Sequence, residues 1–213
     1  MTAAKVWPAS IVLAHFLLHH KSTLAGRWIF EFGAGKAVPS LAAKLSGIVS
    51  SVFLQELPID SLLAMQRSIF AANDLFTSPP SLVQVPMKWG QIPLQMPLEF
   101  PTGKGIFVAA DCLYDKDDFA DFIATVAYFL DRCRGSPFVL CYQDRNLLYS
   151  IDELLDHWSL KSALIPLSSF KFEVGPFLAA NSADLVEDFP EENTDTIMVL
   201  LEVRRHDEAF SFV

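Results

Sequence analysis

The chain has 213 residues, of which 52% are hydrophobic and 19% charged, and its formal net charge is −9. This length is enough to bury the core of one globular domain, and no linker-like segment divides the chain in two. Because an acidic chain lacks the basic face that nucleic-acid binding requires, we expect no direct binding to nucleic acid and favour a basic protein or peptide as partner.

The sequence contains neither a membrane-spanning segment nor a secretion signal that we can identify. Its longest apolar run, residues 11–18, is interrupted by His15 and is far shorter than the roughly 20 residues that a bilayer requires. His15 and His19 lie four residues apart without a third candidate ligand, so we expect no metal site. Three cysteines without metal or redox spacing suit a reducing compartment: Cys112, Cys133 and Cys141. We therefore expect a soluble, intracellular protein.

Strand-like and helix-like segments alternate along the chain, as in an α/β fold. In the first half we expect a helix from Pro8 to about His20, a strand at 28–32, a short helix at 39–45, a strand at 49–55, a helix opening at Pro58, a loop at 78–81 and a strand at 82–85. In the second half, after an irregular proline-rich stretch at 91–104, we expect a strand at 105–110, a helix capped by Asp117 and Asp118, a strand at 138–142, a short helix from Ser150 to Trp158, and strands at 162–167 and 196–204.

The last two strands are close enough in sequence to pair antiparallel. We therefore predict one domain over 1–213, with an N-terminal helix at 6–20, a cofactor-binding core at 28–142, and a C-terminal helix with antiparallel strands at 150–213.

A glycine-rich turn follows the first strand and is the most informative segment of the chain. Glu31 is followed by Gly33, Ala34 and Gly35, and such a turn lets a nucleoside cofactor approach bare backbone. A dinucleotide site would have a third glycine where Val38 stands, and Glu31 would repel a pyrophosphate. S-adenosylmethionine carries an ammonium and a sulfonium, so the charge of Glu31 favours it over NAD. A tight turn without ligand is the alternative.

Polar and aromatic residues at the ends of the next two strands extend this site. Glu56 follows Glu31 by about twenty-five residues, close to the spacing of the acid that accepts the ribose hydroxyls, although it could also be an ordinary surface acid. Trp89, followed by Gly90, could stack on adenine or belong to the core.

The end of the fourth strand is where we expect the reactive end of the cofactor. Asp111 there could orient a substrate amine while Tyr114 shapes the slot around it; alternatively, Asp111 caps the next helix. Residues 142–145 would line the substrate side or form a polar turn. A late cluster of acids forms either a solvated loop or an acidic lip for a basic tail: Asp184, Glu187, Asp188, Glu191, Glu192 and Asp195.

These motifs, in this order, resemble family 16 of the seven-strand methyltransferases over nearly the whole chain. The resemblance rests on Val6-Trp7-Pro8, on Glu31-x-Gly33-x-Gly35 with Pro39, on Trp89-Gly90 and on Asp111-x-x-Tyr114. It implies a Rossmann-like class I fold with a seven-stranded, mostly parallel sheet whose last strand is antiparallel. It also implies S-adenosylmethionine as cofactor. Carried over by position, the cofactor contacts would be Trp7, Gly33, Ala34, Gly35, Glu56, Trp89 and Ala110.

The resemblance further implies methylation of protein side chains. Most of the family modifies lysine, whereas the branch that this chain most resembles is associated with histone arginine and the nucleus. We therefore expect a histone arginine methyltransferase of the nucleus and cytoplasm, with Asp111 and Tyr114 as catalytic residues. The alternatives are a lysine or small-molecule methyltransferase, or a binding module that keeps the fold without turnover. The sequence does not specify the oligomeric state.

Two positions depart from the family pattern. Trp7 stands near the start of the chain, where the family usually has a preceding extension, so a segment that covers the substrate or the sheet edge is expected to be missing. The second strand ends in Gln55 and Glu56 where the family more often has Asp.

Overall fold

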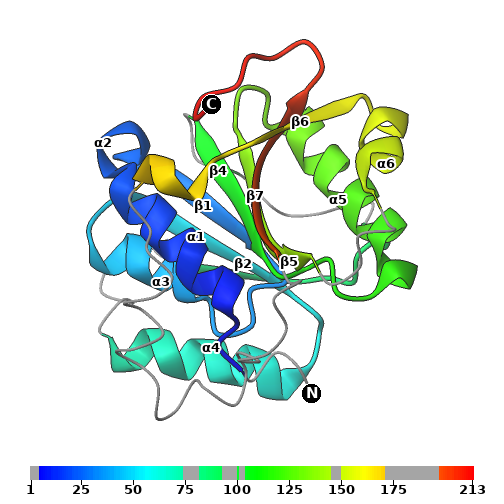
Figure 1. The fold of residues 1–213 in the computed structure, drawn as a ribbon. Helices are drawn as coiled ribbons and strands as arrows, with labels where there is room; N and C mark the ends of the chain where they lie inside the picture. The colour runs from blue at the N-terminus through cyan, green and yellow to red at the C-terminus, as the bar shows by residue number, and fades with distance from the viewer. Residues whose placement is uncertain (1–4, 74–81, 93–99, 101–103, 145–149, 171–196) are drawn as a thin grey trace.

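The computed structural model describes residues 5–73, 82–92, 100, 104–144, 150–170 and 197–213. Within these residues the centre is a seven-stranded sheet in the order β3-β2-β1-β4-β5-β7-β6 (Figure 1). Its strands are β1 (Arg27–Phe32), β2 (Val49–Glu56), β3 (Leu82–Pro86), β4 (Gly105–Ala110), β5 (Phe138–Asp144), β6 (Leu160–Leu164) and β7 (Ile197–Arg205).

Strands β1 to β5 are parallel, and β7 runs antiparallel to both β5 and β6. The predicted fold class is therefore confirmed. Because β1 lies between β2 and β4, the strand order reverses at β1, and open α/β sheets bind their ligands at such a point.

Helices cover both faces of the sheet (Figure 1). The helices on one side are α1 (Pro8–His19), the short α2 (Lys21–Leu24), α3 (Val38–Leu45) and α4 (Asp60–Ala72), and those on the other are α5 (Phe119–Arg132) and α6 (Asp152–His157). Two 3₁₀ turns, η2 (Lys116–Asp118) and η3 (Leu167–Phe170), complete the described elements. None of the helices in the described ranges is both long enough and apolar enough to cross a membrane.

The side chains of β1 point alternately to the two faces of the sheet and so belong to two different core clusters. Trp28, Phe30 and Phe32 pack in the cluster that contains the buried side chains of α5, whereas Ile29 packs in the cluster of α1 and α3. Successive side chains of a strand point to opposite faces, so Glu31 shares the face of Ile29. The same alternation that buries the aromatic residues therefore directs the Glu31 carboxyl toward α3.

An aromatic cluster forms the core on the α5 side of the sheet. Phe30 and Phe107 are fully buried in it, and Trp28 packs edge-on against Phe107 with ring centroids 5.2 Å apart. A Cβ on Gly105 would lie 2.2 Å from the Trp28 ring, so only glycine allows β4 to begin there. Many of the eighteen phenylalanines thus lie in the core.

A buried ion pair holds the end of the chain against α1. The Arg204 Nε donates to Glu202 at 2.8 Å, and the Glu202 carboxylate also accepts the backbone N–H groups of Ser211 and Phe212. Phe212 then packs edge-on against Phe16 of α1. This packing fixes the helix whose N-terminal end carries Trp7 into the site.

Several predicted boundaries are wrong in detail. Strand β6 ends at Leu164 rather than 167, because Pro166 has no N–H for the ladder and a 3₁₀ turn follows it. Strand β5 continues to Asp144, since its pairing with β7 extends that far. Helix α4 begins at Asp60 rather than Pro58.

The predicted helix caps also differ from the observed ones. Neither Asp117 nor Asp118 caps α5 with its side chain; instead, Asp115 accepts the Asp117 N–H at 3.1 Å and caps the preceding 3₁₀ turn. Helix α6 begins at Asp152, whose N–H donates to Ser150 Oγ at 3.1 Å.

Candidate functional site

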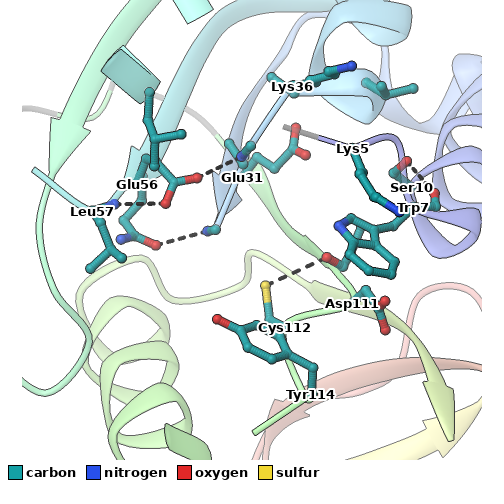
Figure 2. Close-up of a pocket in the computed structure, with 18 of the residues that line it drawn as sticks. Lys5, Trp7, Ser10, Glu31, Lys36, Glu56, Leu57, Asp111, Cys112 and Tyr114 are labelled. Carbon is teal, nitrogen blue, oxygen red and sulfur yellow. Dashed lines mark hydrogen bonds between the residues drawn. The ribbon is translucent and has the colours of Figure 1, made fainter. Parts of the chain in front are cut away.

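A cavity of about 550 Å³ opens at the carboxyl ends of β1, β2 and β4 (Figure 2). Its volume lies within the range of about 300–1,000 Å³ that small-molecule sites occupy. The residues that the sequence predicted as cofactor contacts or catalytic groups all line this cavity: Trp7, Glu31, Gly33, Ala34, Gly35, Glu56, Trp89, Ala110, Asp111 and Tyr114. The fold therefore brings together residues that are up to about a hundred positions apart in the chain.

The turn between β1 and α3 requires glycine at position 33 for two separate reasons. Gly33 has a φ of 53°, in the left-handed region that side chains disfavour. In addition, a Cβ there would lie 2.8 Å from Cys112 Sγ and 3.1 Å from the Trp89 ring. The following Gly35 is also left-handed, and its carbonyl accepts a hydrogen bond from Gln66 at 3.0 Å. The turn is thus held on both sides while its backbone faces the cavity.

Glu31 is a buried acid in the cavity lining. Its side chain is 2% exposed, and its Oε2 accepts the N–H of Ser40 in the first turn of α3 at 3.1 Å. Burial raises the pKa of Glu31 to about 8, with a smaller contribution from Glu56, although the hydrogen bonds from Ser40 act in the opposite direction. A cationic ligand group beside Glu31 would offset this burial and favour the ionised carboxylate.

Glu56 is buried as well, which makes its interpretation as an ordinary surface acid wrong. One carboxylate oxygen accepts the N–H of Gly35 at 2.8 Å and the other accepts the N–H of Leu57 at 2.8 Å. Burial raises the pKa of Glu56. Each oxygen retains a second lone pair, so contact with ribose hydroxyls remains a prediction that these bonds allow.

Trp89 packs against the core and also lines the cavity. Its ring lies 4.8 Å from that of Phe122 on α5, and its Nε1–H donates to Gln55 at 2.9 Å. Stacking of this ring on adenine stays a prediction.

Asp111 adopts a left-handed backbone conformation at the end of β4. Its φ is 56°, its side chain is 7% exposed, and its Oδ1 accepts the N–H of Gln143 at 3.3 Å. The prediction that it caps the following helix is wrong, since α5 begins only at Phe119. A non-glycine residue in this backbone region is typical of a functional site. Figure 2 shows Asp111 and Trp7 across the cavity from Glu56 and Leu57, with Tyr114 on the Asp111 side.

Tyr114 and Cys112 follow Asp111 in the lining and differ in exposure. The Tyr114 side chain is 53% exposed, and burial of part of its ring together with nearby Asp118 raises its pKa. Cys112 is 3% exposed, its thiol donates to the Phe32 carbonyl at 3.4 Å, and burial raises its pKa well above the ordinary value. At neutral pH Cys112 is therefore a thiol that packs under the turn rather than a nucleophile.

Sequence reasoning missed a second set of lining residues. Gln55 stands beside Glu56 and contacts the turn, and three lysines bring positive charge to the cavity: Lys5, Lys36 and Lys88. A polar residue at the last positions of an otherwise buried strand was the available signal for Gln55. No local pattern marks the lysines, which reach the cavity only through the arrangement of three loops.

Other expectations about the site are wrong or lie outside the described residues. Residues 142–144 do not line the cavity, because β5 continues through them and pairs with β7; position 145 and the late acidic cluster of 184–195 are outside the described ranges. Within the described ranges no group of three metal-ligating side chains occurs.

The lining fits S-adenosylmethionine. Glu31 offers an anionic partner for an ammonium, Glu56 offers acceptors for ribose hydroxyls, and the turn at Gly33 and Gly35 allows the backbone to approach the ligand closely.

Comparison with solved structures shows the same fold. An S-adenosylmethionine-dependent methyltransferase from Clostridium acetobutylicum has a TM-score of 0.55 at 10% identity, with 92% of this chain and 90% of that chain covered. An rRNA methylase from Streptococcus thermophilus has a TM-score of 0.53 at 11% identity, with 94% and 99% covered.

Comparison with curated sequences shows the family. The histone-arginine methyltransferase METTL23 of Homo sapiens is 34% identical over 166 residues, which cover 78% of this chain and 83% of that protein. The EEF1A lysine methyltransferase 3 of Xenopus tropicalis is 29% identical over 126 residues, which cover 59% and 52%. Residues 1–152 match the family described as lysine methyltransferase. The chain therefore belongs to this family of methyltransferases, and S-adenosylmethionine is its cofactor.

Proposed function

We propose that the chain methylates arginine side chains of histones, with Asp111 as the residue that orients the guanidinium and accepts its proton. The observation that carries this proposal is the Asp111 carboxyl itself, which a left-handed backbone holds in the cavity lining at the end of β4. The histone-arginine names of relatives that are 32–34% identical support the choice of arginine.

The chemistry of the acceptor explains why a carboxylate is needed. When bound, S-adenosylmethionine supplies an electrophilic methyl group on its sulfonium. The nitrogen that receives this methyl must present a lone pair, yet a guanidinium has a pKa above about 12 and keeps its proton in water. A buried carboxylate can align the planar guanidinium by hydrogen bonds and take up the proton as the bond to carbon forms. In this proposal Asp111 does this, and Tyr114 shapes the slot around the guanidinium.

Lysine is the second candidate acceptor, because the family is described as lysine methyltransferase and one relative is named for a lysine substrate. A lysine amine loses its proton more easily when a pocket desolvates it, so it depends less on a carboxylate acceptor. Methylation of arginine and methylation of lysine consequently differ in how strongly turnover requires Asp111.

The test is incubation of the chain with radiolabelled S-adenosylmethionine and core histones, followed by mass spectrometry of each labelled band. We expect label on arginine, and a histone peptide with every arginine replaced by lysine should lose it. Equal labelling of the lysine peptide would assign the chain to lysine. Cofactor binding without label on any histone would instead favour another substrate or a binding module without turnover.

The proposal also concerns where the protein acts. A histone methyltransferase must meet its substrate, which is made in the cytoplasm and used in the nucleus, so we propose both compartments. Fractionation of cells that express a tagged chain tests this. Confinement of the protein to a membrane-enclosed compartment other than the nucleus would contradict it.

A further inference from the structure

Gln55 is a polar side chain of the cavity lining that makes three hydrogen bonds. Its Oε1 accepts two hydrogen bonds, from the Gly33 N–H and the Trp89 Nε1–H, each at 2.9 Å. Its Nε2 donates to the carbonyl of Met87 at 2.6 Å. The side chain is 2% exposed. The orientation of the amide is determined by these partners, because two donors face one end and a carbonyl faces the other.

The three partners belong to two segments that are distant in sequence and meet only at the cavity. Gly33 lies in the turn after β1, whereas Met87 and Trp89 follow β3, and β2 separates these two strands in the sheet. The bonds join positions 22 to 34 residues apart. The Trp89 ring also packs against the turn, since a Cβ on Gly33 would lie 3.1 Å from that ring.

We propose that Gln55 is a positioning residue for the cofactor, which it serves by fixing the Gly33 amide and the Trp89 indole in one geometry. A cofactor that lies against the turn and Trp89 gains affinity when both are already in place, because their ordering is then not required at binding. This inference concerns cofactor affinity alone. It therefore stands independently of whether the acceptor is arginine or lysine.

Replacement of Gln55 by Glu gives a variant whose match to the site depends on protonation. A neutral carboxyl has the shape of the amide: its hydroxyl can donate to the Met87 carbonyl while its other oxygen accepts from Gly33 and Trp89. An ionised carboxylate has no donor, so one oxygen would face the Met87 carbonyl and repel it. Burial among acids raises the pKa of such a carboxyl, so both forms are accessible near neutral pH.

The experiment measures the dissociation constant of S-adenosylhomocysteine by calorimetry for wild type and Gln55→Glu across a pH series, with no substrate present. We expect the variant to bind about tenfold or more weakly at about pH 8.5 and within about threefold of wild type at about pH 5.5, as one hydrogen bond is lost and regained. The readout is the ratio of the variant's dissociation constant to that of wild type, because both proteins share the other titratable and charged groups of the lining: Glu31, Glu56, Asp111, Asp118, Cys112, Tyr114, Lys5, Lys36 and Lys88.

Gln84→Glu is the matched control. Gln84 on β3 also donates its Nε2 to a backbone carbonyl, that of Leu63, at 2.8 Å, but its side chain does not line the cavity and reaches the turn indirectly, through Gln66, which donates to the Gly35 carbonyl. Gln84→Glu can make the melting temperature of the protein depend on pH. We expect its ratio of affinities to stay flat across the series.

A pH-independent ratio for Gln55→Glu, or an equal pH course for Gln84→Glu, would overturn the proposal. If Gln55→Glu does not fold, Gln55→Met takes its place, since it keeps the length of the side chain and removes every hydrogen bond. A folded Gln55→Met with wild-type affinity would also overturn the proposal, and a loss of about tenfold or more at an unchanged melting temperature would support it.

Discussion

Two carboxyl groups in the cavity lining, Glu31 and Glu56, are buried, so each favours its neutral form unless a positively charged group lies beside it. Burial raises the pKa of both, that of Glu31 to about 8. An acid whose pKa is raised in the folded protein favours the folded state while the acid is protonated. The contribution of Glu31 is fully present below its unfolded pKa of about 4.5 and is lost as the pH rises through about 8. The ligand-free protein is therefore destabilised, near and above neutral pH, by the same group that we expect to contact the cofactor.

Replacement of Glu31 by Gln should raise stability and lower affinity at once. Above about pH 8 the wild type carries a buried charge that the amide lacks, so the ligand-free variant should melt at least a few degrees higher, as about 1 kcal/mol shifts Tm by roughly 2–4 °C in a chain of this size. At about pH 7.5 it should bind S-adenosylhomocysteine about tenfold or more weakly. Calorimetry and thermal melts check both. A variant that melts higher only below pH 5 would contradict the sign of the shift.

Asp111→Asn separates the chemical step from cofactor binding. Asn tolerates the left-handed backbone as Asp does and can still accept the Gln143 N–H, so the fold should be unchanged. The amide cannot take up a proton, and we expect kcat to fall about a hundredfold, within the range that a general base contributes. The dissociation constant of S-adenosylhomocysteine should stay within about threefold.

Asp115→Asn is the control for that variant. Asp115 lies four residues further along the chain and caps η2 from an exposed position. Asp115→Asn should leave kcat within about threefold of the wild-type value. Equal losses of kcat and cofactor affinity in Asp111→Asn would show instead that Asp111 binds the cofactor or supports the structure.

Packing beneath the turn between β1 and α3 depends on matched sizes in three elements. Gly33 in the turn, Cys112 after β4 and Trp89 after β3 meet so closely that a single methyl group does not fit. Because Cys112 is a buried thiol that donates to Phe32, its role here is to fill volume. The turn can thus present bare backbone to the cavity while its other side remains packed.

Gly33→Ala should destabilise the protein by about 1–3 kcal/mol, since the left-handed φ and the contact with Cys112 both oppose a Cβ. Adding Cys112→Ala should restore the share of the lost stability that arises from the 2.8 Å contact with the sulfur. The share that arises from the left-handed backbone should remain lost. Chemical denaturation of the two single variants and the double variant measures this coupling. Additive losses would show that the sulfur does not limit the turn.

Charge acts over the whole molecule and favours a cationic partner. The chain carries a net charge of −9, and Glu31, Glu56, Asp111 and Asp118 line the cavity beside three lysines. Complementary charge accelerates the encounter of partners more than it strengthens the final contacts, and salt screens it. The acidic segment at 184–195, whose placement is outside the described residues, adds to this charge whether it is a lip or a solvated loop.

For a histone peptide we expect kcat/KM to fall several-fold between about 50 and 300 mM salt while kcat changes little, because screening weakens encounter rather than chemistry. Steady-state rates check this. A variant in which the late acids are replaced by Asn or Gln should show a shallower salt dependence of kcat/KM if these acids form a lip. The acids are Asp184, Glu187, Asp188, Glu191, Glu192 and Asp195. An unchanged dependence would assign them to a solvated loop.

The sequence by itself determined the alternation of strands and helices, the glycine turn after β1 and the residues at the strand ends that line the cavity. These depend on local properties: the period of apolar residues, the φ that glycine permits and the direction of parallel strands. Only the tertiary structure decided that Gln55 bonds to Gly33 and Trp89, that Gln143 holds Asp111 rather than lining the cavity, and that β5 extends to Asp144. Those features depend on which strands become neighbours and on how deeply each group is buried, and no local pattern in the chain specifies either.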